Sequence, residues 1–349
     1  MSTPRPLPER DLAEIMMLAE DDLRELEGTR IFITGGTGFV GTWLVETLLA
    51  ADRQFGLRLG LTLLTRDPTA YGHRRPHVAR DERVTLHEGD VRTFTAPQRH
   101  DLVVHAGTPT SMARTSAEQS DLYSNIVHGM ERVLDQAAAW GRPRLLFTSS
   151  GAIYGRQPPD LLLTPEGHLG GPDPLSTATT YHEAKRVAEL QAALAVESGD
   201  VDTIIGRLYA FVGPLLPVNA HFAVGNFIRD ALNGGPVVVE GDGTPMRSYQ
   251  YATDLVVWLV AMLVRGEPGR AYNVGSDEAI DIFALAGLVA TVVNESIRVE
   301  VRGTPDLTKP AERYVPDCRR AREELGLENR VVLSDAVDRT VSWLLLNNP

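Results

Sequence analysis

The stretch R-I-F-I-T-G-G-T-G-F-V-G-T-W-L-V-E-T-L-L-A, residues 30–50, decides the fold. An apolar run at 31–34 predicts a short buried strand, and the pattern at 42–50 predicts a helix. Between these two elements, Gly35, Gly38 and Gly41 recur at intervals of three residues. Glycines at this spacing let backbone amides approach a pyrophosphate, and the N-terminus of the following helix offers partial positive charge. The stretch therefore predicts a strand, loop and helix that bind the pyrophosphate of a dinucleotide.

Further apolar strands alternate with helices up to residue 208. The ranges that resemble strands are 61–65, 84–90, 101–107, 144–150 and 201–208, and those with helical periodicity are 120–139 and 181–197. Apolar strands joined by helices indicate a parallel sheet that is covered on both faces. The predicted fold class is α/β, with a Rossmann-type doubly wound parallel sheet.

The chain divides into three segments on this interpretation. Residues 9–26 carry apolar side chains at helical spacing, with acids between them. They predict an amphipathic helix in an N-terminal extension, 1–27, packed outside the main fold as a cap or a partner contact. The NAD(P)-binding Rossmann domain takes 28–212. Because Gly and Pro punctuate the chain after that point, we expect 213–349 to form mainly a smaller C-terminal substrate-binding lobe, with some segments returning to the Rossmann domain.

The composition excludes several classes of protein. A hydrophobic content of 43% in 349 residues is typical of a globular protein with a sizeable core. The formal charge of -12 argues against a nucleic-acid partner, which requires a basic patch. A single cysteine, Cys318, excludes an intrachain disulfide and a cysteine-built metal site, and we expect no metal. No apolar run reaches the ~20 residues of a membrane span and the N-terminus lacks the apolar core of a signal peptide, so we expect a cytoplasmic protein without membrane contact.

The end of the second strand bears on which dinucleotide binds. An acid there holds the ribose 2′-hydroxyl of NAD, whereas an arginine accommodates the 2′-phosphate of NADP. This chain has Thr65 at the acid's position, followed by Arg66 and Asp67. The charge of Arg66 favours NADP, but Asp67 is near enough along the chain to reach the ribose. The expected cofactor is NAD(P), with NAD placed first and NADP as the alternative.

The segment T-T-Y-H-E-A-K-R, 179–186, carries a sharper signal. Tyr181 and Lys185 are i and i+4 on a predicted helix and share a face. With nine tyrosines and two lysines in the chain, such a pair is expected by chance only about 0.05 times. A free tyrosine has a pKa near ~10, and a nearby ammonium favours its phenolate. The pair therefore predicts a tyrosine that acts as a general base.

Together these segments resemble the extended short-chain dehydrogenase/reductase family, in particular its nucleotide-sugar epimerases, dehydratases and decarboxylases. The resemblance runs from Arg30 onward. It implies that T-G-G-T-G-F-V-G is the dinucleotide loop, that G-D-V at 89–91 contacts the adenine, and that H-A-G-T at 105–108 lines the cofactor. With the strand end above, the residues expected to bind the cofactor are Gly35, Gly38, Phe39, Val40, Gly41, Thr65, Arg66, Asp90, Val91, Ala106, Gly107, Thr108, Tyr181 and Lys185.

The resemblance also implies the catalytic and substrate residues. Tyr181 and Lys185 match the catalytic pair, and T-S-S-G-A-I-Y-G at 148–155 places Ser150 at the position of the active-site Ser or Thr. Downstream segments imply that Asn226, Arg247 and Arg313 contact the diphosphate of a nucleotide sugar, together with Ser150 at the sugar, and arginine suits a diphosphate because it binds bidentately. Asn125 matches a structural asparagine, and helices 120–139 and 181–197 resemble the family's dimer interface, which implies a homodimer.

Two departures from the family's pattern affect the expected reaction. Dehydratases of the family commonly carry Asp-Glu directly after the active-site Ser or Thr, and decarboxylases a glutamate, whereas this chain has Gly151 and Ala152. In Tyr209-Ala210-Phe211 it lacks an asparagine with which many relatives touch the sugar. The expected activity is a nucleotide-sugar 4-epimerase acting through a transient 4-keto sugar with tightly bound NAD(P), on a GDP-sugar of an antibiotic pathway. The alternatives are a dehydratase or decarboxylase, an NADPH-dependent keto-sugar reductase, and a non-catalytic redox sensor.

Overall fold

The computed structural model describes residues 6–108, 115–220, 222–306 and 308–347, so the first five residues of the predicted N-terminal extension lie outside it. The chain divides into two compact units. The first consists of Met1–Ile153, Pro172–Arg207 and Val256–Tyr272, and the second of Tyr154–Gly171, Leu208–Leu255 and Asn273–Pro349. The N-terminal segment thus belongs to the first unit, and the chain passes between the units several times.

The first unit is built around a seven-stranded sheet, whose strand order is β11-β6-β5-β4-β1-β2-β3. Its strands are β1 Arg30–Thr34, β2 Gly60–Thr65, β3 Val84–Glu88, β4 Leu102–His105, β5 Arg144–Ser150, β6 Asp202–Leu208 and β11 Ala271–Val274. β1 pairs in parallel with both β2 and β4, β2 with β3, and β4 with β5. The order reverses direction at β1, which is the arrangement of a doubly wound fold. The predicted fold class is confirmed.

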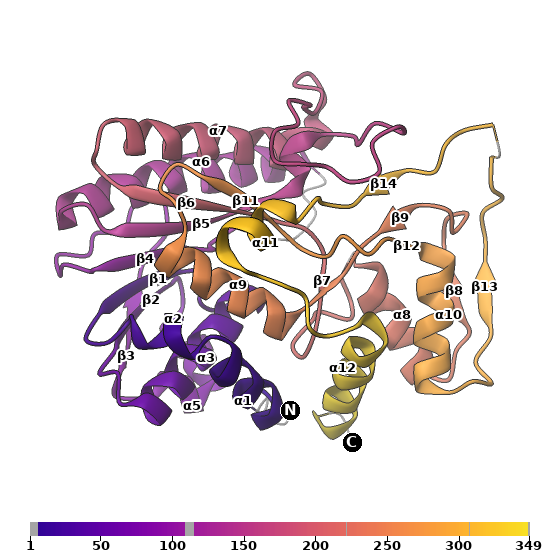
Figure 1. Ribbon diagram of the computed structural model, residues 1–349, viewed down its shortest axis with the longest axis horizontal. Coiled ribbons are helices and arrows are strands. Elements are labelled where there is room, and N and C mark those ends of the chain that lie inside the picture. The colour runs from indigo at the N-terminus through magenta and orange to yellow at the C-terminus, as the bar shows by residue number, and fades with distance from the viewer. Residues whose placement is uncertain (1–5, 109–114, 221, 307, 348–349) are drawn as a thin grey trace. The chain divides into compact units, whose positions relative to one another are not determined.

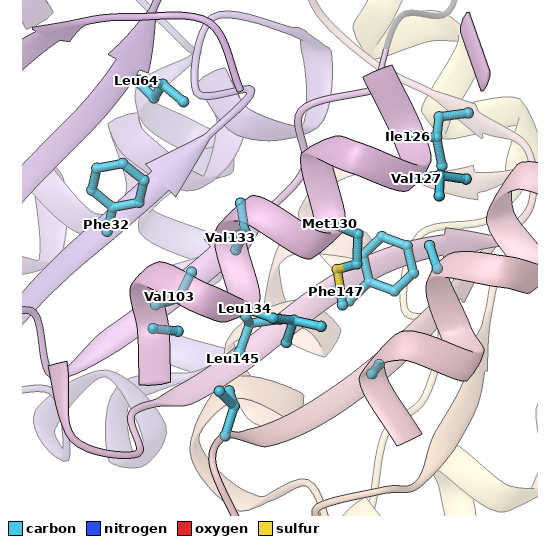
Figure 2. Packing of buried hydrophobic residues seen from close by; sticks show 14 of the residues in the cluster. Phe32, Leu64, Val103, Ile126, Val127, Met130, Val133, Leu134, Leu145 and Phe147 are labelled. Atoms are coloured by element: carbon cyan, nitrogen blue, oxygen red, sulfur yellow. The ribbon is translucent and has the colours of Figure 1, made fainter. Parts of the chain in front are cut away.

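Helices cover both faces of this sheet, α6 and α7 on one face and α3 on the other (Figure 1). The helices here are α3 Phe39–Phe55, α4 Pro68–Arg74, α5 Pro76–Ala79, α6 Ser116–Trp140, α7 Thr180–Glu197 and α9 Ala252–Arg265, with 3-10 turns at Gly151–Tyr154 and Thr177–Thr179. The core beneath α6 and α7 includes Met130 and Phe147, shown together in Figure 2, and both are fully buried. Burial of such side chains contributes about 1.5–3 kcal/mol each.

Local chemistry fixes where α6 begins and ends. The Thr115 hydroxyl accepts a hydrogen bond from the Glu118 N–H at 3.2 Å, and the Glu118 carboxylate accepts one from the Thr115 N–H at 2.9 Å. This reciprocal pair satisfies two donors that a helix start otherwise leaves open. Gly141 ends the helix in the left-handed region, at φ 91°. The helix is therefore longer at its start than the apolar periodicity at 120–139 predicted.

The N-terminal segment forms two short helices where one was predicted. α1, Glu9–Leu18, and α2, Glu20–Arg24, are separated at Ala19, whose φ of -115° and ψ of 17° are not helical. The apolar spacing did not reveal the break, because Ile15 and Leu23 are buried on either side of it. The segment is tied into the first unit by the Leu7 N–H, which donates to Glu46 on α3 at 2.8 Å.

The second unit contains small sheets and helices. Its elements are β7 Phe211–Val212, α8 Ala223–Leu232, β8 Val237–Val239, β9 Met246–Arg247, β10 Gln250–Tyr251, β12 Ile280–Asp281, α10 Ile282–Val293, β13 Val299–Val301, β14 Arg313–Tyr314, α11 Arg319–Leu325 and α12 Leu333–Asn347. β10 pairs with β7 and β13 with β8, and a three-stranded sheet has the order β12-β9-β14. Throughout the described ranges of both units, every helix is too short or too polar to cross a bilayer.

Candidate active site

The glycine loop between β1 and α3 has the backbone that its sequence predicts. Gly35 has φ 70°, and a Cβ there would lie 2.3 Å from the Ala106 carbonyl oxygen, so only glycine fits. A Cβ on Gly41 would lie 2.2 Å from the Gly35 oxygen. A Cβ on Gly38 would meet only that oxygen, at 3.4 Å, and would otherwise fill open space over the loop. Gly38 is also the N-cap of α3 and makes no side-chain cap. The loop therefore has the space and the backbone to fit a pyrophosphate group, which the N–H groups of the first turn of α3 would hold.

A buried histidine holds the end of β4 against the glycine loop. The Thr34 hydroxyl accepts a hydrogen bond from the Gly107 N–H at 3.1 Å and lies 2.7 Å from His105 Nδ1. The proton in this contact belongs to the hydroxyl or to Nδ1, according to the tautomer of the neutral imidazole. Burial, and then the charge of Lys185, lower the pKa of His105 to about 3, so this state persists at neutral pH. The segment 106–108 is thereby fixed beside the loop.

Ser150 and Tyr181 come together at the end of β5 and the start of α7. Ser150 is buried, and its hydroxyl accepts a hydrogen bond from the Ala152 N–H at 3.2 Å. Burial raises the pKa of the Tyr181 phenol, and the hydrogen bond with Ser150 opposes that rise. The two hydroxyls thus form a connected pair through which a proton can move.

Lys185 lies one turn further along α7 and is 1% exposed. Its ammonium donates to the Thr108 hydroxyl at 2.8 Å and to the Thr148 carbonyl at 2.6 Å. It also lies over two aromatic rings, 4.6 Å from the Phe147 centroid and 6.0 Å from that of Tyr181. Burial lowers the pKa of Lys185 to about 7, partly offset by the charge of Glu189. A buried, strongly shifted lysine beside a tyrosine is typical of a catalytic site.

The contacts of Glu189, which lies one turn after Lys185 on α7, were not predicted from the sequence. Glu189 is buried on α7, accepts a hydrogen bond from Ser149 at 2.5 Å, and forms an ion pair with Arg207 at 2.7 Å. Tyr181, Lys185 and Glu189 are spaced by four residues, so all three lie on one face of the helix. That spacing was the available signal, since an acid four residues after Lys185 on a buried face needs a partner.

The adenosine end of the cofactor site contains more charges than the sequence motif showed. Thr65 ends β2 and is buried, whereas Arg66 and Asp67 are exposed.

Asp90 is held by Arg92 through two contacts, at 2.8 Å and 2.7 Å, and Arg92 also pairs with Asp121. The bonds from Arg92 lower the pKa of Asp90 to about 2. The next residue, Val91, packs toward Gly129 of α6. Asn125 donates to the Asp121 carbonyl at 2.8 Å, in keeping with a structural role.

All the predicted cofactor and catalytic residues lie in the first unit, and the three predicted diphosphate residues lie in the second. Asn226 is on α8, where its amide oxygen accepts from Arg229 at 3.0 Å, so its NH₂ group keeps donors for a ligand. Arg247 donates to the Met246 carbonyl and pairs with Glu312 at 3.3 Å.

The register of the small sheet places the two arginines differently. Arg313 is opposite Met246, and Tyr314 is opposite Arg247. Paired residues share a face of a sheet, so Arg247 and Arg313 leave it on opposite faces. To bind the same diphosphate, Arg313 would have to reach round the edge strand β14.

The residues that depart from the family pattern have clear positions. Gly151 and Ala152 form the 3-10 turn that follows Ser150, and neither carries a titratable group. Tyr209 is buried in the second unit against Tyr314, with ring centroids 4.5 Å apart. Its hydroxyl hydrogen-bonds Thr164, and burial raises its pKa. Among the residues that the structure describes, no cluster of three or more His, Cys, Asp or Glu could hold a metal ion.

Comparison with known proteins places this site in a family. The chain is 28% identical over 315 residues to UDP-glucuronic acid decarboxylase 1 of Arabidopsis thaliana, covering 90% of this chain and 69% of that protein. Its fold is similar to UDP-glucose 4-epimerase of Thermotoga maritima, with a TM-score of 0.76, 22% identity and coverage of 91% and 99% of the two chains. It is also similar to dTDP-glucose 4,6-dehydratase of Bacillus anthracis, solved in complex with NAD, with a TM-score of 0.74, 17% identity and coverage of 92% and 98%. Residues 31–275 match the NAD dependent epimerase/dehydratase family, and the chain belongs to that family of nucleotide-sugar modifying enzymes.

Proposed function

We propose that the protein is a nucleotide-sugar 4-epimerase that works through a transient 4-keto sugar and keeps its NAD(P) bound. A bound nicotinamide supplies hydride transfer at C4 of the sugar. The site's own contribution is the proton path. Tyr181 takes the proton of the 4-hydroxyl as a general base, and Ser150 hydrogen-bonds the same oxygen and relays the proton. When Lys185 is protonated, its ammonium nitrogen, 6.0 Å from the centroid of the Tyr181 ring, favours the phenolate by its charge.

The observation that carries this proposal is the 3-10 turn after Ser150. Elimination of water from a 4-keto sugar needs a further acid or base near the sugar. Gly151 and Ala152 offer neither, and Glu189 is committed to Arg207 and Ser149. A 4-keto sugar formed beside Ser150, Tyr181 and Lys185 is therefore reduced again before water is eliminated, and the proposed product is a sugar of inverted configuration at C4.

One observation favours a second candidate. The curated relative reported above is a UDP-glucuronic acid decarboxylase, and the match covers nine-tenths of this chain. A β-keto acid formed by oxidation at C4 can lose carbon dioxide with little help from a side chain. The protein would then act on a nucleotide-linked uronic acid and give carbon dioxide and, once the hydride returns to C4, a nucleotide-linked pentose.

The two candidates separate by product mass. The purified protein is incubated with UDP-, dTDP- and GDP-linked sugars, each also deuterated at C4, and with the corresponding uronic acids. An epimerase gives an isomer of equal mass that retains deuterium at C4, without net turnover of cofactor. A product lighter by carbon dioxide establishes the decarboxylase, and one lighter by water establishes a dehydratase. Stoichiometric loss of NADPH absorbance with substrate points to a reductase. The panel also tests the expected GDP-linked sugar of an antibiotic pathway against the other bases.

A further inference from the structure

The end of β2 is where a dinucleotide-binding sheet distinguishes a ribose 2′-hydroxyl from a 2′-phosphate. The position that holds an acid in NAD-specific sites is Thr65 here. Its hydroxyl accepts a hydrogen bond from the Asp67 N–H at 3.3 Å, so it is used to shape the turn. A threonine supplies no negative charge that would repel a phosphate.

The carboxylates near Thr65 are occupied by the protein or lie one strand away. Asp67 caps α4, with its Oδ1 accepting from the Ala70 N–H at 2.8 Å. Asp90 has both oxygens bound by Arg92. Glu88 is the remaining acid, opposite Thr65 in the register of β2 with β3 and exposed to solvent. The strand end itself therefore presents no acid that is preset to grip two ribose hydroxyls.

Arg66 follows Thr65 and is the cation of this strand end. Across the ranges that the structure describes, its guanidinium takes part in none of the hydrogen bonds or ion pairs found, whereas Arg92 is held by Asp90 and Asp121. Its charge contributes to the low pKa of Asp90, so it lies within electrostatic range of the turn at 89–91. An exposed arginine with all its donors available is suited to bidentate binding of a phosphate.

We propose that the adenosine end of this site selects the 2′-phosphate of NADP(H) over the 2′-hydroxyl of NAD(H), and that Arg66 binds that phosphate. The inference rests on the proposed function only in requiring that the glycine loop holds a nicotinamide dinucleotide. It deepens that function by naming the form of the cofactor.

The test is a binding titration without any sugar. Full-length protein, stripped of nucleotide, is titrated with NADPH and with NADH, and the fluorescence of the reduced nicotinamide is followed. Adenosine 2′,5′-bisphosphate and adenosine 5′-monophosphate, which differ only in the 2′-phosphate, are then compared as competitors. One charge-assisted contact should make NADPH bind at least about tenfold more tightly than NADH. It should do the same for the bisphosphate relative to the monophosphate.

Variants at positions 65 and 66 test which side chain sets the preference for NADPH over NADH. Arg66→Ala should weaken NADPH by about tenfold and leave NADH unchanged, because only the 2′-phosphate contact is lost. Thr65→Asp should reverse the preference. The control is Arg58→Ala, which removes an exposed arginine, paired with Glu27 at 2.6 Å, just before the other end of the same strand. It should change neither affinity.

The outcomes separate this inference from the proposed function. Wild-type protein that binds NADH as tightly as NADPH, or Arg66→Ala that weakens both equally, overturns the 2′-phosphate site but leaves the epimerase proposal standing. Binding of neither dinucleotide overturns both proposals. A preference for NADPH in a protein whose product is not an isomer supports the site and refutes the epimerase.

Discussion

Lys185→Met should change how stability depends on pH, in a direction that the structure determines. Lys185 is 1% exposed, and burial lowers its pKa from 10.5 to about 7. That fall corresponds to about 5 kcal/mol of cost for holding the charged form in the folded protein. Methionine has nearly the same shape without the charge, so the variant avoids this cost. It leaves the Thr148 carbonyl without its donor, which costs about 1–3 kcal/mol at every pH.

The sign follows from proton binding. Between pH 7 and pH 10.5 the unfolded chain keeps the lysine proton while the folded chain has released it. The unfolded state then binds more protons, so the free energy of unfolding rises with pH in this window. For a pKa of about 7 in the folded state, the rise between pH 6 and pH 9 is about 3 kcal/mol. Lys185→Met lacks this group. The free energy of unfolding of the wild type should therefore rise by this amount relative to that of the variant between pH 6 and pH 9.

Urea unfolding at several pH values measures the difference. The control is Lys309→Met, which removes the chain's other lysine, a side chain 77% exposed and paired with Asp306. It should follow the wild type to within about 0.5 kcal/mol at every pH. If wild type and Lys185→Met instead run parallel from pH 6 to pH 9, Lys185 does not titrate near 7, and the account of its burial is wrong.

The remaining predictions concern the rest of the site. Tyr181→Phe should lower the turnover rate about 10²–10⁴-fold while nucleotide-sugar affinity, measured by calorimetry, stays unchanged, because only the proton path is removed. Gly41→Ala should lower both the melting temperature and dinucleotide affinity, since its Cβ would lie 2.2 Å from a carbonyl oxygen, whereas Gly38→Ala should affect mainly affinity. Arg207→Met should destabilise the first unit by about 3–5 kcal/mol in urea, because it leaves the buried Glu189 carboxylate without its cation. The protein should be a homodimer by light scattering, and a species of 38.1 kDa at micromolar concentration would contradict this.

Much of the large sheet could be predicted because its strands are continuous apolar runs. The strand predicted at 144–150 has those bounds in β5, and β2 begins one residue earlier than predicted. The seventh strand, β11, was missed. It has only four residues, Ala271–Val274, and lies in a region punctuated by glycine and proline, more than sixty residues after its neighbour β6. A strand this short has too few residues to show a recognisable sequence pattern. It forms because its backbone pairs with β6, and that pairing cannot be seen in the local sequence.

The site was predictable where its chemistry is carried by spacing, and not where it depends on packing. The glycines and the Tyr181–Lys185 pair could be found because a loop and a helix face impose fixed intervals. The acceptors of Lys185 could not be predicted, since one is a backbone carbonyl, that of Thr148, and the lysine's low pKa comes from burial. The opposite faces of Arg247 and Arg313 likewise depend on a strand register between segments more than sixty residues apart.

The composition sharpens the case that Lys185 is a functional position. Lysine and arginine total 34, and only two are lysine, so arginine takes 34 − 2 = 32 of the cationic positions. A guanidinium at 185 would bring five donors that cannot be deprotonated. Among the described residues, Lys185 has two acceptors, the Thr108 hydroxyl and the Thr148 carbonyl, so three guanidinium donors would lack one of these partners, at about 1–3 kcal/mol each. An ammonium has three donors. Among the described residues, Thr108 and Thr148 satisfy two of them, so an ammonium matches the acceptors at position 185 better than a guanidinium does.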